Sequence, residues 1–217
     1  MTRYNRDNPH PFALPMVILD IETLGLRQDS VVWEIGVVLF TGWPDFEEIA
    51  GKAWFLNMED QEQRYIDPKT VAWTSQVGGD GRRMEAFTDA TKAGLFVSQW
   101  LAEYQTWVEN NWLKVCDLRD DVKRDPCVWT LGTHFDIAMI ENLLQEKKLR
   151  APWKYDKPMD LRTLDRLLTL YKPDAPEKNP DEVPHDALGD CRLQLERFRL
   201  AFAVLDGAIT SSACRHL

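Results

Sequence analysis

The stretch VILDIETLG, residues 17–25, decides the fold. It begins as a short apolar run rich in branched side chains, which is typical of a strand buried on both faces. Two carboxylates, Asp20 and Glu22, then interrupt the run. Because side chains alternate along a strand, residues two apart project from the same face. We therefore expect the two acids side by side at the end of the strand, where Gly25 lets the chain turn away.

The acid pair raises an electrostatic problem that a metal ion solves. Two like charges at this spacing repel, and burying them without a partner costs several kcal/mol. A divalent cation removes the repulsion, since carboxylate oxygens are the ligands that Mg²⁺ and Mn²⁺ prefer. The alternative is a strand end whose acids face water. The pair alone does not decide between the two, and the acids further along the chain favour the metal.

Length and composition predict one globular unit. A chain of 217 residues with 44% hydrophobic and 11% aromatic residues can bury a full core. We expect an irregular lead-in over residues 1–15, a single domain over 16–205, and a tail with little pattern over 206–217. The domain boundaries follow the first and last strongly patterned segments.

Charge and cysteine usage narrow the class of protein. A net charge of −9 argues against a protein that coats nucleic acid by bulk electrostatics, but not against an enzyme whose metal ions supply positive charge locally. The four cysteines form no Cys-x-x-Cys pair, which indicates reduced thiols. With no long apolar segment, the expected location is the cytoplasm.

The remaining pattern predicts a mixed α/β chain. Further strands are expected at 31–40, 52–57 and 128–131. Helices are expected at 67–76, 93–107, 136–149, 160–168 and from 185 or 186 to 205. The aromatic stripe of the 93–107 helix is expected in the core. Residues 110–126 are interpreted as a surface excursion, and the proline-rich 172–184 segment as a loop.

Three more residues complete the candidate site. Asp136 stands where a short strand gives way to a helix, and His185 and Asp190 lie at the start of the last helix. Taken singly, each is ordinary, because an Asp near a helix start usually caps it and a lone His is more often structural. Glu34, inside the second strand, either braces the site or is a locally paired structural acid.

Taken together, these motifs resemble those of the DnaQ-like 3′→5′ exonucleases, in the branch whose fifth residue is His (DEDDh). The resemblance covers residues 16–205 and implies a ribonuclease H-like α/β fold with a central mixed β-sheet flanked by helices. It implies two Mg²⁺ or Mn²⁺ ions held by Asp20, Glu22, Asp136 and Asp190. His185 would be the general base that accepts a proton from the attacking water.

Several segments resemble one branch more closely, the exodeoxyribonuclease VIII-type and mycobacterial exoribonuclease-like proteins. These are Asp67 to Gln76 with Trp73 and Gln76, Pro152-Trp153-x-Tyr155, Asp160-Leu161-Arg162-Thr163, and His185-x-Ala187-Leu188-x-Asp190-x3-Gln194. The resemblance implies substrate contacts from Trp73 and Gln76. One departure is Gly132, since many relatives carry Asn four residues before the third acid. The sequence therefore gives no polar substrate contact at position 132.

The expected substrate is the 3′ end of a nucleic acid, most simply a single strand, from which nucleoside 5′-monophosphates are removed. The backbone of Thr23, Leu24 and Gly25 and the Leu24 side chain are candidates to meet the terminal nucleotide. Phe135 either stacks on a base or packs in the core. We slightly favour DNA, with a 3′→5′ exoribonuclease as the alternative, and a non-catalytic nucleic-acid-binding module as a minor one. A homodimer is one expected assembly, because some relatives act as dimers.

Overall fold

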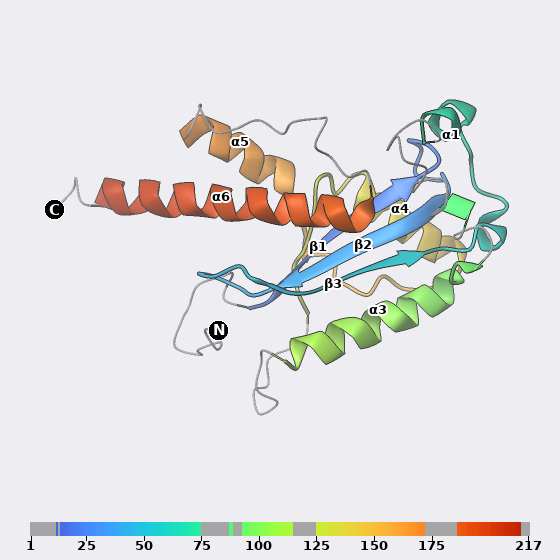
Figure 1. The fold of residues 1–217 in the computed structure, drawn as a ribbon, viewed down its shortest axis with the longest axis horizontal. Coiled ribbons are helices and arrows are strands. Elements are labelled where there is room, and N and C mark those ends of the chain that lie inside the picture. The colour runs from blue at the N-terminus through green and yellow to red at the C-terminus, as the bar shows by residue number, and fades with distance from the viewer. Residues whose placement is uncertain are drawn as a thin grey trace.

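The structure is a computed structural model that describes residues 14–74, 93–114, 125–171 and 186–213, with Phe12, Phe87 and Thr88. Of residues 208–213 only the helical backbone is described. Within these ranges, one sheet is covered by helices on both faces (Figure 1).

The sheet has five strands in the order β3-β2-β1-β4-β5. The strands are β1 (Met16–Thr23), β2 (Val32–Phe40), β3 (Glu48–Phe55), β4 (Val128–Thr130) and β5 (Pro158–Asp160). The β1–β2 and β2–β3 pairs are antiparallel, whereas the β1–β4 and β4–β5 pairs are parallel. The expected central mixed sheet is confirmed, and β1 lies in its middle.

The helices pack on the two faces of this sheet. They are α1 (Pro68–Thr74), α3 (Val97–Trp112), α4 (Asp136–Glu146), α5 (Leu161–Tyr171) and α6 (Ala187–Ala213), with a short 3₁₀ turn at Glu59–Gln61. The α5 and α6 helices lie together on one face, and α3 lies on the other (Figure 1). The α4 helix shares the face of α3, because its apolar side chains belong to the same core cluster.

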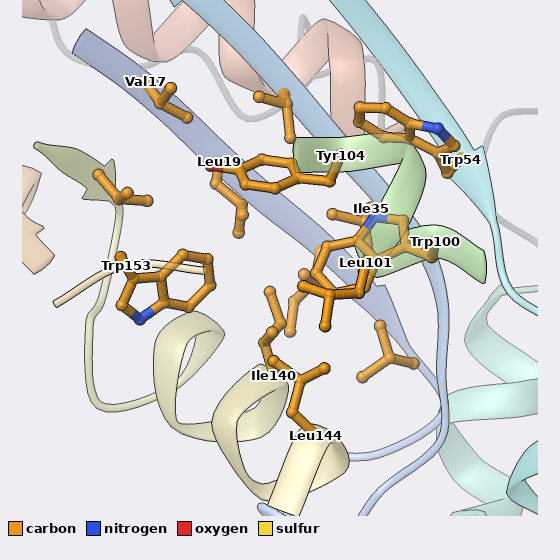
Figure 2. Close-up of a cluster of buried hydrophobic side chains, with 14 of the residues drawn as sticks. Val17, Leu19, Ile35, Trp54, Trp100, Leu101, Tyr104, Ile140, Leu144 and Trp153 are labelled. Carbon is orange, nitrogen blue, oxygen red and sulfur yellow. The ribbon is translucent and has the colours of Figure 1, made fainter. Parts of the chain in front are cut away.

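The alternation of side chains along β1 decides which core each residue joins. Val17, Leu19 and Ile21 pack in the cluster shared with α3 and α4. Figure 2 shows Trp100 and Tyr104 of α3 packed in this cluster, together with Ile140 of α4. Trp100, Tyr104 and Trp107 of the predicted 93–107 helix therefore pack in or against the core, as expected, whereas Phe96, the residue before α3, is 49% exposed.

The opposite face of β1 is apolar at one end and acidic at the other. Met16 and Ile18 pack against α5 and α6, in a cluster with Phe198 of α6. Two and four residues beyond Ile18, the same face carries Asp20 and Glu22. The apolar contact under α6 therefore ends where the candidate site begins.

The structure changes the bounds of three predicted elements and adds one strand. The third strand is Glu48–Phe55, earlier than the predicted 52–57 segment, because it pairs along β2 as far as Phe40. The β5 strand was not predicted, since three residues beginning with a proline carry no strand pattern and depend on pairing with β4. The α3 helix continues to Trp112, into the predicted excursion. The α6 helix continues to Ala213, into the predicted tail.

Among the helices that the structure describes, none combines the length and apolar character needed to cross a membrane.

Candidate metal centre

Asp20 and Glu22 lie side by side at the end of β1, as the alternation of the strand predicted. One carboxylate oxygen from each, together with one from Asp190 of α6, forms a group whose members all lie within 4.8 Å of one another. Two of these acids come from one strand and the third from a helix about 170 residues later in the sequence. On the neighbouring strand, Glu34 is buried and lies opposite Glu22 in the register.

A glycine on β2 allows α6 to bring Asp190 to this point. Gly36 is the register partner of Asp20. A Cβ atom at position 36 would lie 2.2 Å from the carbonyl carbon and 2.3 Å from the carbonyl oxygen of Ala187, the first residue of α6. Only a residue without a side chain lets the start of α6 rest on the strand backbone. The Asp186 carboxylate accepts a hydrogen bond of 2.7 Å from Gly189 N, which caps the same end of the helix.

Asp136 reaches the same edge of the sheet from β4. Because β4 runs parallel to β1, the carboxyl ends of the two strands are neighbours, and Asp136 opens α4 just beyond β4. Asp136 is buried, with its backbone N–H donating to Gly132 O at 3.0 Å. It lies outside the tight three-acid group, but its charge raises the pKa of Asp20.

The pKa values of Asp20 and Asp136 are both raised in this crowded, buried group of carboxylates. Burial raises the pKa of Asp20 well above its ordinary value, and the charges of Asp136, Glu22 and Asp190 raise it further. Burial also raises the pKa of Asp136 to about 7. Burial also raises the pKa of the Cys191 thiol, next to Asp190 in α6, and the charges of Asp20, Asp136 and Asp190 raise it further. Without a bound cation, burial and mutual repulsion therefore disfavour the charged forms of these carboxylates.

Gln194, one turn beyond Asp190 on α6, was noted in the sequence only as part of a motif. Its side-chain N–H donates a hydrogen bond of 2.7 Å to Asp20 Oδ1, and this bond opposes the raised pKa of that carboxylate. The Gln194 side chain is 3% exposed, and among the described residues its Oε1 has no hydrogen-bond partner. Gln194 therefore fixes the orientation of one carboxylate of the cluster.

The donor set fits a divalent metal ion of the Mg²⁺ or Mn²⁺ type. All of the candidate ligands are carboxylates, which these hard cations prefer. The raised pKa of Asp20 shows the electrostatic strain that a bound cation would relieve. The thiol of Cys191 is buried and does not belong to the tight group, which consists of Asp20, Glu22 and Asp190.

Two of the predicted site residues, His185 and Gln76, lie outside the described residues. Trp73 is described, and its side chain is 47% exposed near the end of α1. Phe135 is partly buried and packs against the core cluster under α4, so packing accounts for at least part of its surface. Thr23 is buried, and its hydroxyl donates to Gly25 O at 2.8 Å.

The Leu24 side chain, which was expected to meet the terminal nucleotide, is buried instead. It is 1% exposed and packs with Val31 and Trp33, so it offers no surface to a nucleotide. The register of β1 shifts between Glu22 and Thr23, and just beyond this irregularity the Leu24 side chain joins the cluster with Val31 and Trp33. The exposed leucine of this loop is Leu26, at 80%.

The sheet order, the flanking helices and the meeting of acids from β1, α4 and α6 define the ribonuclease H-like fold of the DnaQ-like exonucleases. The family model described as the 3′-5′ exoribonuclease Rv2179c-like domain matches residues 16–201. The chain belongs to this family. A search among curated protein sequences found no match.

Solved structures support the fold assignment. The chain is similar to E. coli exonuclease I in complex with a 5cy-dA13 oligonucleotide, with a TM-score of 0.63 and 15% identity over 91% of the chain and 43% of that protein. It is also similar to the nuclease domain of 3′hExo, a DEDDh family member bound to rAMP, with a TM-score of 0.58 and 16% identity. That match covers 91% of this chain and 94% of the other. The chain thus spans less than half of exonuclease I but nearly all of the 3′hExo nuclease domain.

Proposed function

We propose that the chain is a metal-dependent 3′→5′ exonuclease that releases nucleoside 5′-monophosphates from the 3′ end of a nucleic acid. The observation that carries the proposal is the convergence of Asp20, Glu22 and Asp190 within 4.8 Å, with Asp136 at the same sheet edge. A non-catalytic binding module has no use for so many buried acids in one place, since each carries a cost in stability. Membership of the exoribonuclease-like family supports the same reading.

In this proposal Asp20, Glu22, Asp136 and Asp190 hold two Mg²⁺ or Mn²⁺ ions. Such ions, when bound, polarise an attacking water and stabilise charge on the departing 3′-oxygen. Gln194 keeps Asp20 turned toward the cluster through its 2.7 Å hydrogen bond. His185, assigned from the motif it shares with Asp190, is the general base, and it accepts the proton of the attacking water when its imidazole is neutral.

The substrate that we propose is single-stranded RNA, which reverses the slight preference for DNA drawn from the sequence. The description of the family names an exoribonuclease, and this favours the alternative stated there. The 3′hExo nuclease domain was solved with a ribonucleotide, rAMP, while E. coli exonuclease I was solved with single-stranded DNA. The fold therefore accommodates both sugars in relatives, and the family description is what supports RNA for this chain.

Two exposed apolar side chains are candidates to stack on the terminal bases. Leu26 follows the acids in the loop after β1, and Trp73 lies near the end of α1. This loop and α1 are joined by the hydrogen bond from Asp67 N to Leu24 O at 2.7 Å. The indole of Trp73 can stack on an unpaired base, and the Leu26 side chain can pack against one, without reading its sequence.

Metal binding is the experiment that tests the centre itself. Mn²⁺ or Mg²⁺ should raise the melting temperature of the wild type, because the ions bind the folded state and relieve its repulsion. Asp20→Asn should remain folded, lose most of this metal-induced increase and show no nuclease activity. Wild-type nuclease activity that persists in excess chelator would contradict the proposal.

A further inference from the structure

Arg162, in the first turn of α5, places a cation against the loop that carries Asp136. A Cβ atom at Gly132 would lie 2.9 Å from both Cζ and Nη2 of Arg162 and 3.1 Å from its Nη1. The guanidinium thus occupies the space that a side chain at position 132 would fill. Gly132 begins the turn whose carbonyl accepts the Asp136 N–H, so Arg162 lies beside the acidic cluster.

The position of this arginine is not explained by the stability of α5. A positive charge in the first turn of a helix is unfavourable, because the helix dipole is positive there. Asp160, two residues earlier, does not neutralise the guanidinium directly. Its Oδ1 accepts from the backbone N–H of Arg162 at 2.8 Å, and its Oδ2 accepts from the backbone N–H of Thr133 at 3.3 Å.

The guanidinium also lacks an ion pair within the part of the chain that the structure describes. Its one polar side-chain contact is between Nη1 and the His134 Nε2, at 3.3 Å. Arg162 is exposed to solvent, so an anion can approach it. An exposed cation that has no carboxylate partner among the described residues, held next to a site for phosphodiesters, is a suitable phosphate ligand.

The charge of Arg162 acts on the cluster without entering it. It lowers the pKa of Asp136, against the larger effect of burial. Yet its guanidinium lies against Gly132 and His134, whereas the tight group for a metal ion is formed by Asp20, Glu22 and Asp190, so Arg162 does not occupy the place of the metal ions. The phosphate that meets the metal ions is the scissile one. A cation just beside that place therefore meets the next phosphate along the strand.

We infer that Arg162 binds the phosphodiester immediately 5′ of the scissile bond and so holds the strand in register with the metal centre. The inference rests on the proposed function, because it assigns a substrate contact of the same site. A bidentate guanidinium contact to phosphate carries no base preference. Arg162 therefore contributes affinity and positioning equally on all sequences.

The experiment measures binding of single-stranded RNA by fluorescence anisotropy, with Ca²⁺ in place of Mg²⁺ to prevent turnover. Arg162→Gln should weaken binding on the order of 10-fold for every sequence, and lower the slope of log K against log salt by about 0.7. Arg162→Lys should recover part of the affinity, since lysine keeps the positive charge but cannot donate two parallel hydrogen bonds to one phosphate. The matched control is Arg166→Gln, which removes an exposed arginine one turn further along α5.

A substrate with one neutral methylphosphonate locates the contact. Placed at the phosphodiester next to the scissile bond, the neutral group should weaken binding by the wild type and have little further effect on Arg162→Gln. An equal penalty in both proteins, or equal affinities of Arg162→Gln and Arg166→Gln, would overturn the inference. Failure of the proposed function would show differently, as a wild type that releases no nucleotide with Mn²⁺ whether or not it binds RNA.

Discussion

The side-chain amide of Gln194 on α6 donates a hydrogen bond of 2.7 Å to Oδ1 of Asp20 on β1. This bond joins the two elements that supply the tight group of three acids. Because the Gln194 side chain is buried, the amide is held in place by packing as well as by the bond itself. The orientation of the first acid is thus fixed by the same helix that carries Asp190.

Gln194→Met keeps the volume of the side chain and removes the hydrogen bond. We expect Mn²⁺ affinity or activity to fall roughly 10–100-fold, as is usual when a partner of a metal ligand is lost. The melting temperature of the metal-free protein should change little, because the loss of the hydrogen bond to Asp20 is offset by the removal of the buried Gln194 Oε1, which has no partner among the described residues. Gln105→Met, at an exposed position of α3, is the control. Metal titrations that do not distinguish the two variants would contradict this role.

Gly36→Ala tests whether the close approach of α6 to β2 builds the site. The added methyl would lie 2.2–2.4 Å from backbone atoms of Ala187 and Leu188, so the start of α6 must move. We expect a loss of roughly 1–3 kcal/mol in the free energy of unfolding and a weaker response of the melting temperature to Mn²⁺.

The matched control for Gly36→Ala is Gly207→Ala. A Cβ at position 207 meets no atom within 4 Å, so this change inside α6 should stabilise the protein by about 0.5–1 kcal/mol. Unfolding is followed by circular dichroism with increasing urea. A Gly36→Ala protein with unchanged stability and unchanged metal response would show that α6 does not need this contact.

Asp136 makes the stability of the metal-free protein depend on pH. Burial raises its pKa from the ordinary value of an aspartate to about 7 in the folded state. A raised carboxyl pKa contributes stability that is fully present below the unfolded value and is lost as pH rises through the folded value. The melting temperature in chelator should therefore fall between about pH 4 and pH 7, and Asp136→Asn should flatten this fall.

The melting temperatures of the metal-free wild type and Asp136→Asn are best compared at pH 8, above the folded-state pKa of Asp136. There the metal-free Asp136→Asn protein should melt on the order of 5 °C above the metal-free wild type, because a buried charge has been removed. With Mn²⁺ the order should reverse, since the wild type alone keeps all its ligands. A lower melting temperature of Asp136→Asn in chelator at pH 8 is the outcome that this account does not allow.

His185→Ala separates a catalytic from a structural role of the histidine. As a general base, His185 should contribute on the order of 10²–10⁴-fold to the rate, while metal affinity stays close to that of the wild type. A histidine that only caps or packs α6 predicts lost stability with near-normal turnover. Rate, metal affinity and melting temperature are measured on the same preparation, because the pH profile alone also reflects the ionisation of bound water.

The sequence predicted the parts of the site that depend on local periodicity. Asp20 and Glu22 share a face because side chains alternate along β1, and the structure places them together. Leu24 was expected to meet the terminal nucleotide because it follows the acids, but it is buried just beyond the register shift of β1 between Glu22 and Thr23. The order of the motifs along the chain was enough to indicate the ribonuclease H-like fold.

What the sequence did not reveal depends on contacts between distant residues. Nothing local in β2 shows that the backbone of Ala187 will rest on Gly36, more than 140 residues earlier. Nor does the motif around Arg162 show that its guanidinium fills the space over Gly132. The β5 strand is likewise defined by its partner β4 and not by its own three residues.

The most direct measurement of the central claim is the digestion of single-stranded RNA and DNA of one sequence, each labelled at its 5′ end, with Mn²⁺. A 3′→5′ exonuclease shortens the labelled strand one nucleotide at a time and releases nucleoside 5′-monophosphates, faster on RNA in our account. Asp20→Asn and wild type in chelator should leave both strands intact, and circular strands should resist. Rapid cutting of circles, or immediate release of the 5′ label as a mononucleotide, would contradict the account.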